Sequence, residues 1–523
     1  MSYSGTNGSF GRTLKEYGCI MQTEEKNNNM EMDDEMVVRI PLIYELSKPG
    51  RRAYELPQLD VPKQDATKIL GAKYMRKEKA MLPEIDTLGL VRHFTNLSRR
   101  NIGLDSSFYP LGSCTMKYNP KVNEVVAAMP KYLKVHPYQK DEHVQGTLHM
   151  LFEMQEYLKD IAGLDAVSLA PAAGAHGELS SMMVIKAYHQ SQGNSRNLVL
   201  IPDSAHGTNP ASCAVCGYDV KTIKSSANGF LEIEDLKANL NDTVAALMIT
   251  NPNTLGLFEE KIKEITELVH EAGALVYMDG ANMNALLGIA RPGDFGIDVM
   301  HYNLHKTFST PHGGGGPGAG PIAVCSLLED FLPGLIVTKD EDGIYRTVSM
   351  PESIGQTRMY FGSIGVILKA YAYIRRMGKE GLGQVGKIAV LNANYIMNKL
   401  KDVYHLPYDR VCMHECIFSA DEFKKNTQVR TLDIAKRLLD YEIHPPTVYF
   451  PLIVSEAIMI EPTETENKET IDKFIEVMKS IATEAQEEPW KVQEAPYMTP
   501  VTRLDEVKAA REPILKYTPN SKK

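Results

Sequence analysis

Residues 301–320 read HYNLHKTFSTPHGGGGPGAG, and this stretch says more about the fold than any other part of the chain. Its one lysine, Lys306, lies between His305 and His312 and precedes a glycine-rich loop, while an apolar segment ending in Asp279 comes before it. A lysine that forms an imine with an aldehyde cofactor needs a partly desolvated amine, and the cofactor's ring nitrogen needs a fixed carboxylate. A surface lysine beside a flexible loop would look similar, so the neighbouring segments must decide.

The composition is that of a soluble globular protein with two or three domains: 523 residues, 43% hydrophobic and 24% charged. A formal net charge of −9 argues against a nucleic-acid or anionic-membrane surface. No apolar run reaches the roughly 18 residues of a membrane span. The first eight residues lack the pattern of a secretory signal, and seven cysteines do not indicate a disulfide framework. We therefore expect a cytoplasmic protein.

The composition and residue pattern change along the chain and predict four regions. Residues 1–35 are polar and asparagine-rich, which predicts a mobile tail. Residues 36–110 contain scattered prolines and predict an extended arm with short helices, laid across a partner or across the main domain. Residues 111–377 form the predicted large domain, and residues 378–523 the predicted smaller α+β domain.

Short apolar runs alternate with helix-sized segments in the large domain, which predicts an α/β fold: a mostly parallel sheet with helices on both faces. The predicted strands are 166–170, 198–202, 220–223, 245–250, 275–278 and 299–302, with helices at 179–190 and 257–272. In the smaller domain we expect a long helix through 388–400, a strand at 410–418 and a helix at 467–486.

Two loops after predicted strands carry small or polar residues suited to a bound anion and ring. Gly174 and Ala175 open the helix after the first strand, where free backbone N–H groups and the helix dipole favour a phosphate. His206 follows the second strand, near the carboxyl edge of the sheet where ligands bind in open α/β folds, and could stack on a flat ring. Alone, each is explained equally well by ordinary turn chemistry.

The next loops complete the pattern. Asn251 ends a core strand, and its amide could hydrogen-bond a phenolic oxygen, although a turn explains it as well. Asp279 ends another buried strand, where a carboxylate is costly unless paired, and a protonated ring nitrogen would pair with it. Ala281 would then lie under the ring. Phosphate loop, histidine, aspartate and lysine in this order predict a pyridoxal 5′-phosphate site, with Lys306 bound to the cofactor as an imine and His305 beside it.

Cysteine spacing raises one alternative, a zinc site. Cys213 with Cys216, and Cys412 with Cys416 around His414, would have to converge across about 200 residues. A strand over 411–416 and buried free cysteines explain the pattern as well. We therefore expect no metal.

Several long motifs resemble the glycine cleavage system P-protein family, glycine dehydrogenase (aminomethyl-transferring, decarboxylating). The likeness covers roughly residues 40–500. The matching stretches are 108–117 (FYPLGSCTMK), 171–178, 203–210, 251–258, 279–282, 291–294 and 303–316. The family has the fold type I pyridoxal-phosphate architecture, and its long form fuses two homologous halves. This chain is about half that length and resembles the lysine-bearing half, which is subunit 2 of the split form.

The resemblance implies decarboxylation of glycine and transfer of the aminomethyl group to the lipoyl arm of a small H-protein. Lys306, His206 and Asp279 would be the catalytic residues. The resemblance further implies a catalytically poor subunit 1 as obligatory partner, in a heterotetramer of two of each. Arg291 and Arg358 are candidates for binding the glycine carboxylate, and His312 could line the site or fix the glycine loop.

Other functions stay open at this stage. One is another enzyme of the same fold: an amino-acid decarboxylase that needs no lipoyl partner, or a cysteine desulfurase. A desulfurase needs a mobile catalytic cysteine, whereas Cys325 falls in a strand-like run. A non-catalytic subunit that kept the fold is the remaining alternative, against which Lys306 and Asp279 argue.

Overall fold

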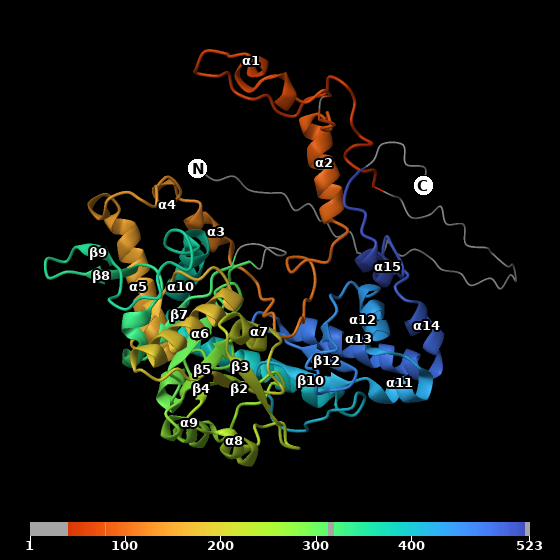
Figure 1. Cartoon of the computed structure of the whole chain (residues 1–523). Helices are drawn as coiled ribbons and strands as arrows, with labels where there is room; N and C mark the ends of the chain where they lie inside the picture. Colours follow the sequence, from red (N-terminus) through yellow and green to blue (C-terminus); the bar gives the residue numbers. More distant parts are fainter. Residues whose placement is uncertain (1–39, 79, 312–317, 518–523) are drawn as a thin grey trace, which may run out of the picture.

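A computed structural model describes residues 40–78, 80–311 and 318–517 of this chain. The predicted N-terminal tail and His312, with the glycines at 313–316, lie outside the described residues. Figure 1 shows a large domain and a smaller domain side by side, with the N-terminal helices α1 and α2 projecting from them.

The large domain is built on a sheet of seven strands in the order β1-β7-β6-β5-β4-β2-β3. Neighbouring strands pair in parallel, except that β7 is antiparallel to both β1 and β6. The six predicted strands are confirmed to within two residues at each end. The strands are β1 Ala166–Ser168, β2 Leu198–Pro202, β3 Asp219–Ile223, β4 Val244–Thr250, β5 Leu275–Gly280, β6 Val299–Tyr302 and β7 Ile322–Val324.

Helices cover both faces of this sheet, because successive strand residues point to opposite sides and both sides are apolar. Leu200, Leu247 and Val276 belong to the cluster that includes residues of α5, α8, α9 and α10 (Ile364–Leu400). Val199 and Met248 belong to the cluster that includes α6 and α7 residues. The helices are α5 Gln145–Ala162, α6 Gly174–Ser191, α7 Thr208–Val215, α8 Ile233–Asn239 and α9 Ile262–Glu271. The predicted α/β architecture is confirmed.

One helix of the large domain is shorter than predicted. We expected a helix from residue 257, but α9 begins at Ile262. Leu257 packs instead in a separate apolar cluster with Leu255 and small-domain residues such as Met459, which holds 257–261 out of the helix.

The smaller domain follows α10 (Ile364–Leu400), a 37-residue helix in which Gly378 breaks the helical geometry with φ 61°. Its sheet has the antiparallel order β10-β12-β11, formed by β10 Cys416–Ser419, β11 Thr447–Val448 and β12 Ala457–Ile460. The strand predicted at 410–418 was too long at its start. The predicted helix at 467–486 is confirmed as α13 Lys468–Glu487, beside α11 Asp421–Thr427, α12 Thr431–Leu439 and α14 Pro489–Glu494.

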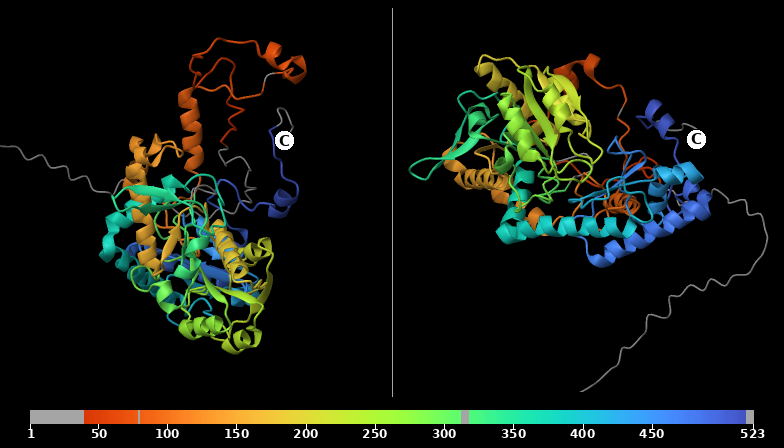
Figure 2. Two further views of the ribbon diagram at one scale, coloured as in Figure 1. Left: turned by 60° about the vertical axis from the view of Figure 1, so that its left-hand side comes forward. Right: turned by 90° about the horizontal axis from the view of Figure 1, so that it is seen from below.

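The N-terminal arm is thinly attached to this body (Figures 1 and 2). Among its described residues between 40 and 105, only Ile85 and His93 are buried. The elements of this region are α1 Ala66–Leu70, η1 Ala72–Tyr74 and α2 Thr87–Ser98, followed by α3 Lys121–Ala127, α4 Pro130–Leu133 and η2 Asp141–His143. The remaining elements are η3 Pro292–Phe295, η4 Ser326–Phe331, β8 Ile336–Lys339, β9 Tyr345–Val348 and α15 Glu506–Arg511.

Candidate active site

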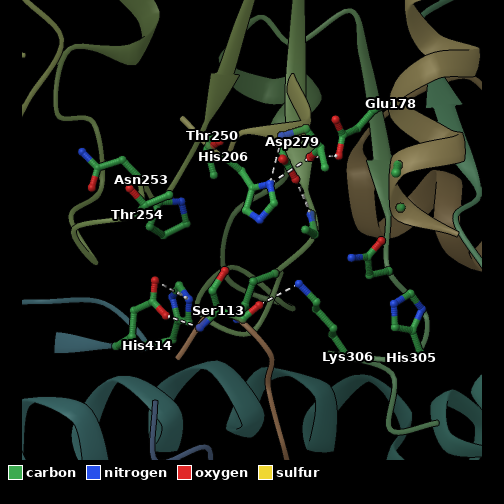
Figure 3. Close-up of a pocket in the computed structure, with 18 of the residues that line it drawn as sticks. Ser113, Glu178, His206, Thr250, Asn253, Thr254, Asp279, His305, Lys306 and His414 are labelled. Carbon is green, nitrogen blue, oxygen red and sulfur yellow. Dashed lines mark hydrogen bonds and ion pairs between the residues drawn. The ribbon is translucent and has the colours of Figure 1, made fainter. Parts of the chain in front are cut away.

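A cavity of about 310 Å³ opens at the carboxyl ends of the large-domain strands. Seven of the eight predicted site residues line it: Gly174, Ala175, His206, Asp279, Ala281, His305 and Lys306. In the view of Figure 3, Asp279 and Lys306 lie on opposite sides of this space. The sheet brings these residues together because the carboxyl ends of parallel strands meet at one edge.

Asp279 lies at the end of β5 and is held from several sides. The Ala281 N–H donates to its Oδ1 at 2.9 Å, and the Asn209 side chain donates to its Oδ2 at 3.4 Å. His301, on the neighbouring strand β6, places its Nε2 3.6 Å from Oδ1, and the Tyr277 hydroxyl lies 2.6 Å from the other ring nitrogen. These contacts fix the direction of a buried carboxylate that faces the cavity.

His206 is linked to a buried acid through a threonine. Its Nδ1 lies 2.9 Å from the Thr208 hydroxyl, which donates to Glu178 Oε1 at 2.9 Å. Burial, and then the charge of Asp279, raises the pKa of Glu178 to about 7. Glu178 thus sets the orientation of His206 and itself changes charge near neutral pH.

The start of α6 forms a small-residue loop against the cavity. Its N-cap, Ala173, makes no side-chain capping bond, so the first backbone N–H groups of this 18-residue helix are open to an anion. A side chain at Gly174 would collide with the Asn303 amide, and one at Gly320 would collide with the backbone at Ala173. The close packing therefore requires glycine at both positions.

Lys306 points toward the wall opposite the sheet. Its Nζ donates to the Ser113 carbonyl at 2.6 Å, and the Ser113 N–H donates to Glu415 Oε2 at 2.8 Å. Ser113 and Thr115 have φ values of 63° and 49°, in the left-handed region that costs energy for residues other than glycine. The segment through Ser113 therefore joins Lys306 to the small domain.

The small domain contributes three buried polar residues. His414, Glu415 and Glu461 place one ligand-type atom each within 4.8 Å of one another. Burial, then the positive charge of Lys306, lowers the pKa of His414 to about 3, so its ring is neutral. His414 Nδ1 has no hydrogen-bond partner among the residues that the structure describes.

Asn251 is the predicted site residue that does not line the cavity. Its Oδ1 accepts a hydrogen bond from the Glu259 N–H at 3.0 Å, and it precedes a cis peptide bond to Pro252. The residues of this loop that line the cavity are Thr250, Pro252, Asn253 and Thr254. A contact from Asn251 to a phenolic oxygen stays a prediction.

The proposed carboxylate-binding arginines also lie off the cavity wall. Arg291 pairs with Asp294 at 2.7 Å, with about half of each side chain exposed. Arg358 donates to the Ser363 hydroxyl and lines a different cavity, of about 470 Å³.

The cysteine pairs of the zinc alternative do not converge. Cys213 and Cys216 belong to the core under α6 and α7, whereas Cys412 and Cys416 belong to the small-domain core. Cys325, predicted to fall in a strand-like run, comes directly after β7 and is the N-cap residue of η4 (Ser326–Phe331).

Sequence reasoning missed the wall contributed by the segment after the arm and by the small domain, and part of the sheet side. The missed residues include Ser113, Glu178, Thr208, Asn303, His414 and Glu415. Glu178 could have been found from the sequence. It is an acid in the second turn of an otherwise buried helix, and a buried acid needs a polar partner. Ser113 lies in the 108–117 motif, but nothing in the sequence pairs it with Glu415, since the two are 302 residues apart in the chain.

Comparisons with known proteins identify the family of this chain. A family model described as glycine cleavage system P-protein matches residues 63–349, and one described as glycine dehydrogenase, C-terminal domain, matches residues 385–497. The chain belongs to the glycine cleavage system P-protein family. Within that family, the "Probable glycine dehydrogenase (decarboxylating) subunit 2" of Listeria monocytogenes is 56% identical over 91% of this chain and 98% of that protein. The protein of the same name from Caldanaerobacter subterraneus is 55% identical over the same shares.

Solved structures confirm the fold as that of the fold type I pyridoxal-phosphate enzymes. An inhibitor-bound glycine decarboxylase (P-protein) of the glycine cleavage system superposes with a TM-score of 0.67 at 20% identity, covering 79% of this chain and 94% of the other. A sphingosine-1-phosphate lyase from Burkholderia pseudomallei gives 0.60 at 13% identity, over 82% and 96%. Among the described residues, no helix is both long and apolar enough to cross a bilayer.

The residues present fit a pyridoxal-phosphate group. The cavity is large enough for a ring and pairs a fixed carboxylate, Asp279, with an amine, Lys306. A small-residue helix start borders the same space, which suits a phosphate. His301 Nε2 and Asn303 Oδ1 are buried beside it without hydrogen-bond partners among the described residues.

Proposed function

We propose that this chain is the lysine-bearing subunit of a cytoplasmic glycine decarboxylase. It would use pyridoxal 5′-phosphate to release CO₂ from glycine and pass the aminomethyl group to the lipoyl arm of an H-protein. One observation carries the proposal: Lys306 and Asp279 face one ring-sized cavity that also opens onto the start of α6. The names of the relatives support the choice of glycine among the substrates of this fold.

Each wall residue has a distinct task in this reaction. When bound, the cofactor supplies an aldehyde for amines and a ring that accepts the electrons released by decarboxylation. Lys306 would hold the cofactor covalently and afterwards return as an amine that moves protons. Asp279 would keep a proton on the ring nitrogen, and its contacts with Ala281 and Asn209 hold it in place. His206, oriented by Thr208, would cover the ring.

The phosphate would be held by Gly174, Ala175 and the dipole of α6, with no charged side chain needed. From the small domain, His414 and Glu415 line the wall of the cavity that faces the sheet. His305 lines the same cavity next to Lys306.

The N-terminal arm supports the proposal of a partner subunit. Four large apolar side chains of α2 are exposed, namely Leu88, Val91, Phe94 and Leu97, and Leu56 before it is 86% exposed. A 12-residue helix without tertiary support is marginal in water, and an exposed apolar surface of this kind marks a protein interface. We propose that the arm packs on a subunit 1 chain in a heterotetramer of two of each.

The test of the function is the variant Lys306→Ala, compared with Lys339→Ala on the exposed hairpin. Co-expressed with a subunit 1 chain, wild type and Lys339→Ala should show the visible absorbance of lysine-bound cofactor. Borohydride reduction should add the cofactor mass to the peptide that contains Lys306. Lys306→Ala should lose both signals and, with H-protein present, at least about 10³-fold of the exchange of labelled bicarbonate into glycine.

Two outcomes would contradict the proposal. Cofactor mass on a different lysine, or unchanged exchange in Lys306→Ala, would show that the site is elsewhere. Release of CO₂ from a larger amino acid at full rate without H-protein would point to a decarboxylase of another substrate.

A further inference from the structure

Glu415 is a buried acid that faces the cavity with one oxygen poorly satisfied. Its Oε2 accepts a hydrogen bond from the Ser113 N–H, but its Oε1 lies 3.7 Å from His414 Nε2, too far for a hydrogen bond. The side chain is 4% exposed and has no lysine or arginine in an ion pair among the described residues. A buried carboxylate in such a setting is costly, whereas a carboxylic acid is not.

Glu461 lies behind Glu415 and is satisfied as a carboxylate. It accepts hydrogen bonds from the Thr115 N–H at 3.0 Å, the Thr115 hydroxyl at 2.7 Å and the Asn282 amide at 2.8 Å. Three donors favour the ionised form of an acid. The two acids therefore differ: Glu461 is built to carry the charge, and Glu415 is built to carry a proton.

The electrostatics agree with this division. Burial, and then the charge of Glu461, raises the pKa of Glu415 well above its usual range. Burial raises the pKa of Glu461 as well, although its hydrogen bonds oppose the shift. Ligand-type atoms of the two acids lie within 4.8 Å of each other, and two acids this close favour a state in which they share one proton.

The other titratable groups around the pair do not compete for this proton. The positive charge of Lys306 lowers the pKa of both acids and so works against protonation of both at once. His414 is neutral, and burial raises the pKa of Cys114, which keeps it a thiol. Of the two acids, only Glu415 lines the cavity, so the proton on Glu415 faces the cavity.

We propose that Glu415 is a catalytic proton donor that protonates the sulfur released when the lipoyl disulfide opens, and that Glu461 is a positioning residue that keeps Glu415 protonated. The proposal rests on the function proposed above. It assigns the small-domain wall a chemical role, in addition to lining the cavity.

The step balances in atoms and electrons. The carbon that has lost CO₂ forms a bond to one sulfur of the disulfide, and the S–S electron pair leaves on the other sulfur. That sulfur takes the proton of Glu415 and becomes a thiol, so the disulfide is reduced while the carbon is oxidised. Glu415 regains a proton that the glycine ammonium group gives up when its nitrogen is bound covalently. The net result moves one ammonium proton of glycine to the thiol.

The experiment uses the complete enzyme with its partner subunit and compares Glu415→Gln with Glu476→Gln, an exposed acid on α13. Glu415→Gln should bind cofactor and respond spectrally to glycine like wild type, yet transfer the aminomethyl group to H-protein about 10²–10⁴-fold more slowly. Glu415→Asp should recover part of this loss. Infrared spectra of the cofactor-free protein at neutral pH should contain a carboxylic-acid band that Glu415→Gln lacks and Glu476→Gln keeps.

Glu461→Gln provides a second test. Without the negative charge of Glu461, the pKa of Glu415 falls, so the alkaline limb of the transfer rate should move about one unit or more to lower pH. The proposal is overturned if Glu415→Gln transfers at the wild-type rate, if no acid band is lost, or if the purified enzyme holds a divalent ion that both variants release. If cofactor binding itself fails in wild type, the proposed function fails instead.

Discussion

The two walls of the cavity are built in different ways. On the sheet side, Asp279 lies at the end of β5, while His206 and Lys306 follow β2 and β6, and the parallel sheet alone brings them to one edge. On the opposite side, Ser113 comes from the segment after the arm and Glu415 from the small domain, 302 residues apart. The positions of the sheet-side residues follow from the local sequence pattern of the strands. The opposite wall forms only when segments that are far apart in the chain come together.

The wall opposite the sheet depends on a buried ion pair, and its removal should have the largest effect on the free energy of unfolding. Lys117 is 1% exposed and pairs with Glu464 of the small domain at 2.7 Å, with Asn284 and Tyr373 of the large domain also in contact. Burial alone would lower the pKa of Lys117, but Glu464 and Tyr373 raise it above its usual value. The ion pair thus joins both domains through the segment that carries Ser113.

Lys117→Met should lower the free energy of unfolding by about 3–5 kcal/mol, because it leaves the Glu464 charge buried without its partner. Denaturant titration of the holoenzyme measures this. The control is Lys121→Met, four residues on, whose ion pair with Asp105 is about two-thirds exposed and should change little. Adding Glu464→Met to Lys117→Met should recover most of the loss; no recovery would show that Lys117 acts by packing alone.

The sequence predicted the sheet wall because the periodicity of apolar runs gives the strand ends, and ligands bind at strand ends. Seven of eight site residues line the cavity for that reason. Asn251 is the exception: its place at the end of β4 was right, but its side chain bonds to the Glu259 N–H within the turn around the cis peptide. Which way a polar side chain turns depends on backbone donors that periodicity does not reveal.

The other wall could not be predicted for a different physical reason. Residues 411–416 alternate like a strand, yet β10 begins only at Cys416. The stretch before it instead bends toward the cavity, where the Met413 N–H donates to the Gly256 carbonyl of the large domain. Contacts between domains override local preference there. The catalytic roles of the residues on either wall stay predictions.

On the sheet wall, the next largest effect on stability is expected from a substitution of Gly174. Gly174→Ala should destabilise the protein by about 1–3 kcal/mol, because the added methyl group collides with the Asn303 amide and must displace the start of α6. Cofactor affinity should fall with it, and absorbance titration of the apoenzyme measures that. Gly146→Ala in α5, where the new atom meets open space, should bind cofactor normally and be no less stable. Equal affinities in the two variants would place the phosphate elsewhere.

The smallest expected effect concerns Glu178, also on the sheet wall, and it appears as a dependence on pH. Its raised pKa, about 7 in the folded state, means that ionisation costs folding energy. The stability that Glu178 contributes is present in full below its unfolded pKa, near 4.5, and is lost as pH rises through about 7. Glu178→Gln removes this loss. Relative to wild type, the unfolding free energy of the cofactor-free variant should therefore rise on the order of 1–2 kcal/mol between about pH 5 and about pH 8.

The comparison variant for Glu178 is Glu476→Gln, whose side chain is exposed and whose stability difference from wild type should not change with pH. Denaturant midpoints at several pH values give the result directly. A flat difference for Glu178→Gln would mean that Glu178 is ionised throughout, with Thr208 and Ser212 stabilising the charge more than burial and Asp279 oppose it. His206 would then be oriented by a permanent carboxylate, and Glu178 would not titrate near neutral pH.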